Sequence, residues 1–161
     1  MTSLIRPHGS DQLIPLYVED SKQRAQLIEK ASTLPSITIS SAAAGNAVML
    51  GGGYFTPLRG FMDKANALSV SNSMQMTDGL FWPTPVLNLV ADASGIRAGD
   101  HIALKDPNVD GSPVIAVQQV ESIDTFSDAE IDQMIQQVYG TIDREHPGVA
   151  EFISHLSLIH I

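Results

Sequence analysis

The spacing of hydrophobic and polar residues changes along the chain. This change divides the chain into a helical first part, a strand-rich middle and a final helix. Before residue 74 the apolar residues recur mainly three or four positions apart, as on one face of a helix. From there to residue 123 they form short runs bounded by Gly, Pro, Asp and Ser, which is typical of strands joined by turns. The order of elements predicts an α+β fold with an antiparallel unit in its middle.

The first part is predicted to hold three helices and one short strand. The first helix begins after Asp20, whose side chain can cap it, and it places Ala25, Ile28 and Ala31 on one apolar face. Alternating polar and β-branched residues mark the strand. The predicted helices cover residues 21–32, 42–50 and 63–71, and the strand covers residues 36–40.

The middle and the end of the chain are predicted to hold strands and one well-marked helix. Residues 81–91 form an apolar run with two prolines near its start, which suits an edge strand or a strand entry. Ser127 and Glu130 have the spacing of a capping box that opens a helix ending at Gly140. The other predicted strands cover residues 101–105 and 113–123, and a hairpin-type turn covers residues 106–112.

The segment after Val149, EFISHLSLIHI, is apolar, lacks helix caps and ends without a turn signal. Two interpretations stay open, a strand that continues into more protein and sequence that is not native to the gene. We therefore expect a single domain over residues 1–153, followed over residues 154–161 by a truncated or non-native tail.

Composition and charge narrow the classes of function. The 161 residues are enough for one domain. Only 17% of them are charged, which leaves open whether the surface packs on another domain or a second subunit. The net charge of -9 disfavours nucleic acid as a partner, because phosphates repel such a surface. The nine Lys and Arg residues are scattered, without the cluster that anionic membrane surfaces attract.

The chain has no cysteine, which excludes disulfides, cysteine-bound zinc and a thiol nucleophile. The first residues, MTSLIRPHGSDQ, do not have the apolar core of a signal peptide. No run of about 18 apolar residues is present, so no membrane-spanning helix is expected. These features are compatible with a cytoplasmic protein, and that location is the expectation.

The glycine run Gly51 to Gly53 is the first candidate for phosphate binding. A phosphate loop of the Walker type requires Gly-Lys followed by Ser or Thr, and no such lysine follows here. The dinucleotide-binding pattern also fails, because Thr56 stands where the last glycine belongs. We interpret the run as a helix end and a turn.

His146-Pro147-Gly148-Val149 contains the first half of the His-x-Gly-His pattern of nucleotidylyltransferases. In that pattern two imidazoles stabilise the phosphoryl transition state at a helix N-terminus. Val149 replaces the second histidine, and we predict a loop with no helix beginning after it.

Other candidate chemistry has simpler explanations. The five histidines, His8, His101, His146, His155 and His160, form no His-Glu-x-x-His array. Asp106 and Asp110 lie in a turn that lacks the closing Glu of a calcium loop. No Gly-x-Ser-x-Gly elbow is present. From the residues alone, no catalytic, cofactor-binding or metal-binding residue is assigned.

Six segments together resemble the N-terminal domain of the ATP sulfurylase (sulfate adenylyltransferase) family. They follow one another in the family's order across residues 6–149, which is nearly the whole chain. The segments are RPHGSDQL (6–13), LPSITIS (34–40), GGGYFTPLRGFM (51–62), DGLFWPTPVLNL (78–89), IALKDPNVDGSPVIAV (102–117) and VYGTIDREHPGV (138–149).

The resemblance implies a PUA-like β-barrel domain with flanking short helices. It also implies the activity of the complete enzyme, in which ATP and sulfate give adenosine 5′-phosphosulfate and pyrophosphate, with Mg²⁺ accompanying the nucleotide. The implied partners are the protein's own catalytic domain and further copies in a homo-oligomer.

The family's catalytic segments, Gln-x-Arg-Asn-Pro-x-His-x-x-His and Gly-Arg-Asp-His-Ala, do not occur in this chain. The resemblance therefore implies a fragment without the catalytic nucleotide-binding domain, inactive by itself. Two alternatives stay open. One is a standalone PUA-like RNA-binding module, which the net charge disfavours, and the other is a regulatory or assembly domain.

Overall fold

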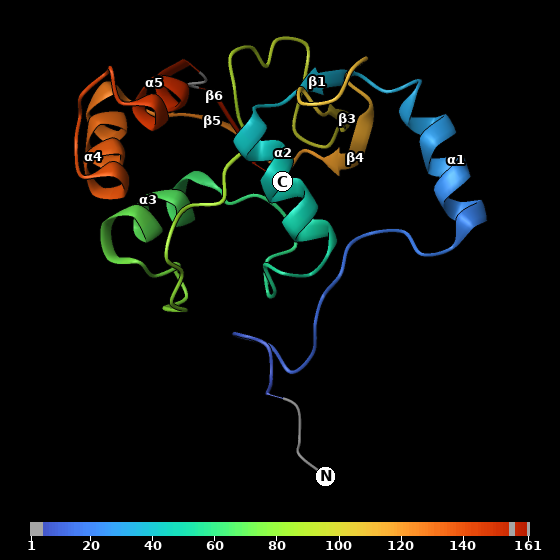
Figure 1. Ribbon diagram of the computed structural model, residues 1–161, viewed down its shortest axis with the longest axis horizontal. Coiled ribbons are helices and arrows are strands. Elements are labelled where there is room, and N and C mark those ends of the chain that lie inside the picture. Colours follow the sequence, from blue (N-terminus) through green and yellow to red (C-terminus); the bar gives the residue numbers. More distant parts are fainter. Residues whose placement is uncertain (1–4, 155–156, 161) are drawn as a thin grey trace.

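Six short strands form two separate three-stranded sheets, and five helices surround them in the described part of the chain (Figure 1). The computed structural model describes residues 5–154 and 157–160. The helices are α1 (Ser21–Ala31), α2 (Ser41–Gly51), α3 (Lys64–Ser73), α4 (Asp128–Tyr139) and α5 (Pro147–Ser154). The strands are β1 (Ser36–Thr38), β2 (Leu89–Val90), β3 (His101–Lys105), β4 (Val114–Gln119), β5 (Ser122–Thr125) and β6 (Ser157–His160). The predicted α+β fold class is confirmed.

The first sheet has the order β1-β3-β4. Strand β1 runs parallel to β3, and β4 runs antiparallel to it with a register shift between Leu104 and Lys105. The predicted strand over residues 101–105 and the antiparallel unit are confirmed. Because β4 pairs with one strand only, its second edge is open in the described sheet.

The second sheet has the order β2-β6-β5, with antiparallel pairing throughout. The single strand predicted over residues 113–123 is wrong, because the chain breaks into β4 and β5 at this point. The Val120 amide donates to the Asp100 carbonyl (2.8 Å), which extends the pairing to the residue just before β3, and β5 then joins the second sheet. Of the run 81–91 only β2 joins a sheet, since Pro83 and Pro85 have no N–H to donate to a ladder.

Two apolar clusters form the interior. The larger cluster lies between α2, the first sheet and the aromatic loop before α3, and the smaller one lies between α3, α4 and α5. The three helices of the smaller cluster gather on one side of the molecule in Figure 1, opposite α1. Fully buried members of the two clusters are Val70, Val86, Ile102, Leu104 and Val120 in the larger, and Ala67, Met134, Ile135 and Val149 in the smaller.

Capping side chains fix the helix starts close to the predicted positions. Asp20, Ser40 and Asp63 each accept a bond from the backbone N–H three residues later. The predicted capping box of α4 is present in full, and Gly140 ends that helix in the left-handed conformation. Helix α3 continues two residues past the predicted end. No helix in the described residues is long and apolar enough to cross a membrane.

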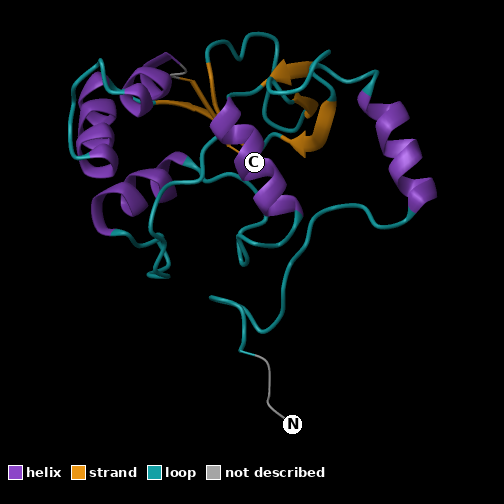
Figure 2. Cartoon of the chain, in the orientation of Figure 1, coloured by secondary structure: helices purple, strands orange, loops and turns teal. Residues whose placement is uncertain are grey.

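The predicted apolar face of α1 does not pack on the interior. Of its three members only Ala31 is buried, Ala25 is exposed, and Ile28 is 66% exposed. The helix lies at the outer side of the molecule, apart from α2, and long loops lead to it from the N-terminal side (Figures 1 and 2). The periodicity predicts the helix correctly, but it does not show what the apolar face of α1 packs against. In the structure the surface opposite this apolar face is open.

The end of the chain contains one helix and one strand in addition to the predicted elements. Strand β6 pairs with β2 and β5, which agrees with the strand interpretation of the tail. The predicted boundary at residue 153 and the truncated or non-native tail over residues 154–161 stay predictions. Residues 155, 156 and 161 lie outside the described residues.

Candidate functional site

The glycine run Gly51 to Gly53 ends α2 and packs against the N-terminal segment. The Gly51 carbonyl accepts the backbone N–H groups of Leu16 (2.9 Å) and Tyr17 (3.1 Å). Gly53 has a φ of 76°, and a Cβ built there would lie 3.0 Å from the Pro15 nitrogen. The interpretation as a helix end and turn is confirmed, and the N-terminal segment packs against Gly53.

Segments distant in sequence meet around Trp82. The His8 ring nitrogen Nε2 lies 2.7 Å from the Phe81 carbonyl oxygen, and the Phe55 ring meets Trp82 edge-on with 5.9 Å between centroids. Gly9 approaches Leu80 so closely that an added Cβ would lie 2.8 Å from its Cδ2 atom. Three of the six segments that carry the family resemblance therefore share one packed region, which gives them a structural role.

The loop predicted for His146 to Val149 is wrong, because α5 begins at Pro147. Proline is favoured at the first helical position, since its missing N–H would have no intrahelical partner there. Val149 is fully buried in the smaller cluster, and the His146 ring lies against Tyr139 at 5.5 Å between centroids. The apolar spacing of Val149, Phe152 and Ile153 was the available helix signal.

The remaining sequence candidates lie apart from one another. Within the described residues no group of three or more His, Asp and Glu side chains is placed to hold a metal ion. Asp106 accepts two bonds from Asn108, from its backbone N–H (2.8 Å) and from its side-chain amide (2.9 Å), as aspartates do in turns. Side chains of His155 and His160 lie outside the described part of the structure.

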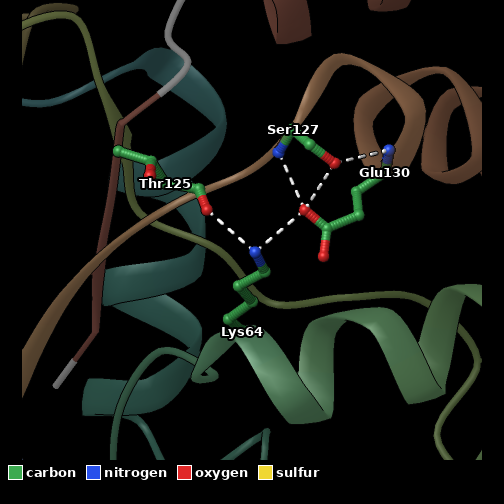
Figure 3. A network of polar contacts seen from close by, with 4 residues as sticks. All are labelled: Lys64, Thr125, Ser127 and Glu130. Carbon is green, nitrogen blue, oxygen red and sulfur yellow. Dashed lines mark hydrogen bonds and ion pairs between the residues drawn. The ribbon is translucent and has the colours of Figure 1, made fainter.

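The most connected polar cluster joins α3 to the start of α4 (Figure 3). Lys64 donates to Glu130 Oε2 (2.8 Å) and to the Thr125 carbonyl (2.9 Å), and Glu130 also accepts from the Ser127 backbone (2.7 Å). The lysine bond, followed by the bonds from Ser127, lowers the pKa of Glu130 from 4.5 to about 2. The cluster ties two helices together and opens no cavity, so we interpret it as a structural clamp.

Because of this clamp, we expect the free energy of unfolding to decrease in acid. Because the folded pKa of Glu130 lies below its unfolded value, its contribution is complete above about pH 4.5 and is lost as the pH falls toward about 2. The free energy of unfolding should therefore differ between the unmodified chain and Glu130→Gln at pH 7, and this difference should shrink at pH 3. Urea titrations at both pH values measure it. The exposed Glu29→Gln is the control, and an equal difference at both pH values would contradict the assignment.

A groove of about 680 Å³ lies between α1, α2 and β4, and it is a candidate for binding. Its volume is within the range of ligand sites, and its walls are mostly apolar. Five consecutive residues of β4, Val114 to Gln118, line one wall. Exposed apolar side chains surround the groove, and they are Leu16, Tyr17, Ile28, Val48, Tyr54, Val114 and Ile115.

Three polar side chains line this groove. Gln118 is only 4% exposed, and neither its Nε2 nor its Oε1 atom has a hydrogen-bond partner among the described residues. Arg24 donates to the carbonyls of Val18 (3.0 Å) and Glu19 (3.1 Å). Arg59 is exposed. A buried carboxamide without partners is unusual in folded proteins, so Gln118 gives this groove unused hydrogen-bonding capacity, and the fully buried Asn88 is a second such carboxamide outside the groove.

Comparison with known proteins gives the family. The PUA-like domain family model matches residues 5–159. The chain belongs to the PUA-like domain family. The match confirms the PUA-like fold expected from the six segments, and it covers both sheets and all five helices described above.

Curated relatives of this PUA-like chain carry the name sulfate adenylyltransferase. The protein of Alcanivorax borkumensis is 52% identical over 154 residues, which are 96% of this chain and 38% of the relative. The protein of Allochromatium vinosum is 52% identical over 151 residues, 94% of this chain and 38% of the relative. The predicted resemblance is confirmed, and the chain spans little more than a third of the length of these relatives.

A solved structure shows the same arrangement of the PUA-like chain. A hexameric APS kinase from Thiobacillus denitrificans superimposes with a TM-score of 0.62 at 31% identity, over 79% of this chain and 24% of that one. In this comparison too, the similarity covers most of the PUA-like chain and only a small part of a longer protein.

Sequence reasoning did not find the groove. Its walls come from α1, α2 and β4, which are distant in sequence, and no local motif marks them. One signal was available: the apolar face of β4 continues from Ala116 to Val120 and is interrupted by Gln118. An amide on the interior face of a strand indicates a position where a partner is required.

Proposed function

We propose that this chain is the PUA-like part of a sulfate adenylyltransferase, and that it contributes architecture rather than chemistry to the complete polypeptide. The observation that carries the proposal is the asymmetry of coverage: 94–96% of this chain matches two relatives of that name, but only 38% of each relative is matched. The conversion of ATP and sulfate to adenosine 5′-phosphosulfate and pyrophosphate is then performed by the unmatched part.

The arrangement of candidate residues supports an architectural role. The carbonyl of Gly51 is bonded to the N-terminal segment, and Val149 is a core residue of α5 where nucleotidylyltransferases place a second histidine. Nucleotide chemistry requires preorganised donors directed at the phosphates, and neither position provides them. Substrate contacts, with Mg²⁺ beside the nucleotide, are proposed for the unmatched part only.

The proposed partners follow from the same comparison. The main partner is the catalytic portion of the complete polypeptide, and assembly into a homo-oligomer has support from the hexameric neighbour. The net charge of -9 disfavours nucleic acid. We propose a cytoplasmic location, with which the absence of cysteine is compatible.

The isolated chain tests the architectural role. We expect no sulfate-dependent release of pyrophosphate from ATP above a protein-free control, because the groups that stabilise the phosphoryl transition state are proposed to lie in the unmatched part. Calorimetric titration with MgATP should likewise give no heat of binding. Turnover above the control, abolished by removing sulfate, would show that the chemistry resides in this chain and would overturn the proposal.

A further inference from the structure

The open edge of β4 faces the groove. The Ala103 amide donates to the Pro35 carbonyl (2.8 Å), so Ala103 directs its backbone groups toward β1. Its neighbours Ile102 and Leu104 consequently bond to Gln118 and Ala116, their register partners in β4. The N–H and C=O groups of Val117 then point away from β3, and no strand of the described sheet pairs with this edge.

The groove includes this edge in addition to part of the sheet face that carries Leu104 and Gln118. A cavity over one face of a strand is lined by every second residue, because side chains alternate between the two faces. Here the lining runs through consecutive positions from Val114 to Gln118. On the opposite side stands α1, with Leu27, Ile28 and Ala31 toward the groove. The space between β4 and α1 thus has the form of a slot beside an unpaired strand.

The groove contains polar groups suited to a peptide. Gln118 offers a buried amide donor and acceptor, which together complement one peptide unit. Arg24 and Arg59 place positive charge along the groove, on a chain whose net charge is -9. The exposed apolar side chains around the groove would pack against alternate side chains of an added strand. An occupant with apolar residues and a carboxylate fits all three features.

We propose that an extended segment with alternating apolar residues and at least one carboxylate adds to β4 as a strand, between β4 and α1. We assign this segment to the part of sulfate adenylyltransferase polypeptides that lies outside the region matched here, so the inference rests on the proposed function. The matched relatives have about 62% of their length outside that region, from the 38% that is covered. A second copy of this chain is less suitable, because two chains of charge -9 repel.

Hydrogen exchange in a hybrid polypeptide tests the strand addition. In this hybrid the chain replaces the matched region of the Alcanivorax borkumensis relative. The amide of Val117 should exchange at least about tenfold more slowly in the hybrid than in the isolated chain, because an added strand protects it. Amides of the second open edge, at Ser36 and Thr38, serve as the internal reference. An equal rate in both proteins at Val117 would overturn the inference.

Two proline variants separate pairing from folding. Val117→Pro removes an outward N–H and leaves the bonds to β3 in place, whereas Thr38→Pro does the same on the opposite edge of this sheet. In the isolated chain, the Val117→Pro and Thr38→Pro variants should unfold at similar temperatures. In the hybrid, Val117→Pro should lower the unfolding midpoint and Thr38→Pro should not. Equal midpoints of the two hybrid variants would contradict strand addition. If the isolated Val117→Pro chain does not fold, Arg59→Glu replaces it, with the same expectation for the hybrid.

Gln118→Met is expected to change stability in opposite directions in the isolated chain and in the hybrid. Met has nearly the shape of Gln without its polar atoms, so the isolated chain should become more stable when the unpaired carboxamide is removed. In the hybrid the same change should be destabilising, because the carboxamide has gained a partner. A stabilising effect in both proteins would contradict the assignment of Gln118 to a peptide partner.

Failure of this inference and failure of the proposed function give different results. A hybrid that produces adenosine 5′-phosphosulfate but leaves the Val117 amide unprotected supports the function and rejects the docking site. A protected edge in a hybrid without activity supports the docking site and rejects the function. If the isolated chain dimerises and protects the edge by itself, a second copy is the occupant and the inference is wrong.

Discussion

Replacing Ile102 by Ala should lower the free energy of unfolding by about 3 kcal/mol. Ile102 is fully buried in β3, and it belongs to the larger cluster, between α2 and the first sheet. Removing its outer carbons loses their transfer free energy and leaves a cavity that close-packed neighbours cannot fill. Domains of this size are stable by about 5–15 kcal/mol, so the loss is a large part of the total. Chemical denaturation followed by tryptophan fluorescence reports it, because Trp82 lies in the same cluster.

Ile142→Ala is the matched control for Ile102→Ala. Ile142 is 58% exposed, in the loop between α4 and α5, so the same chemical change should cost less than about 0.5 kcal/mol. Equal losses at the two positions would show that the first sheet is not the interior of this domain.

Replacing Gly53 by Ala should lower the free energy of unfolding by about 2 kcal/mol. Its φ of 76° is in the left-handed region, which costs any residue with a Cβ atom. The new Cβ would also lie 3.0 Å from the Pro15 nitrogen and 3.2 Å from the Ile14 carbonyl carbon, and both of these are backbone atoms that cannot rotate away. We expect the N-terminal segment to lose its bonds to Gly51 as well.

Gly45→Ala makes the same chemical change with the opposite expected sign. Gly45 lies inside α2, and a Cβ there would meet no atom within 4 Å. Alanine in a helix interior is more stable than glycine by about 0.5–1 kcal/mol, so this variant should gain stability. Thermal unfolding of both variants compares them directly. Destabilisation at Gly45 or a gain at Gly53 would contradict the placement of the glycine run.

Local signals predicted the helices well because their causes are local. Asp20, Asp63 and Ser127 each precede a helix and bond to its first turn, so the sequence alone located three helix starts. The missed helix α5 had its signal too, in Pro147 at the first position. The absence of a second histidine led to the loop prediction, although a missing catalytic residue has no bearing on helix formation.

Features that depend on distant contacts were not predicted. The single strand predicted over residues 113–123 divides after Gln119 because β5 pairs in the second sheet, and nothing near Val120 in the sequence indicates this change of partner strand. Ile28 was assigned to a packed face, but it lies exposed beside the groove, because periodicity shows which residues share a face and not what covers it. The groove itself requires three elements that only the tertiary fold brings together.

The most direct test of the account measures the activity of the hybrid polypeptide in which this chain replaces the matched 154-residue region of the Alcanivorax borkumensis relative. Sulfate-dependent formation of adenosine 5′-phosphosulfate from MgATP is measured for the hybrid, the relative and the isolated chain. The account predicts activity of the hybrid within about tenfold of the relative, which corresponds to a change of about 1.4 kcal/mol in the barrier, and none for the isolated chain. A folded hybrid without activity, or an active isolated chain, would contradict it.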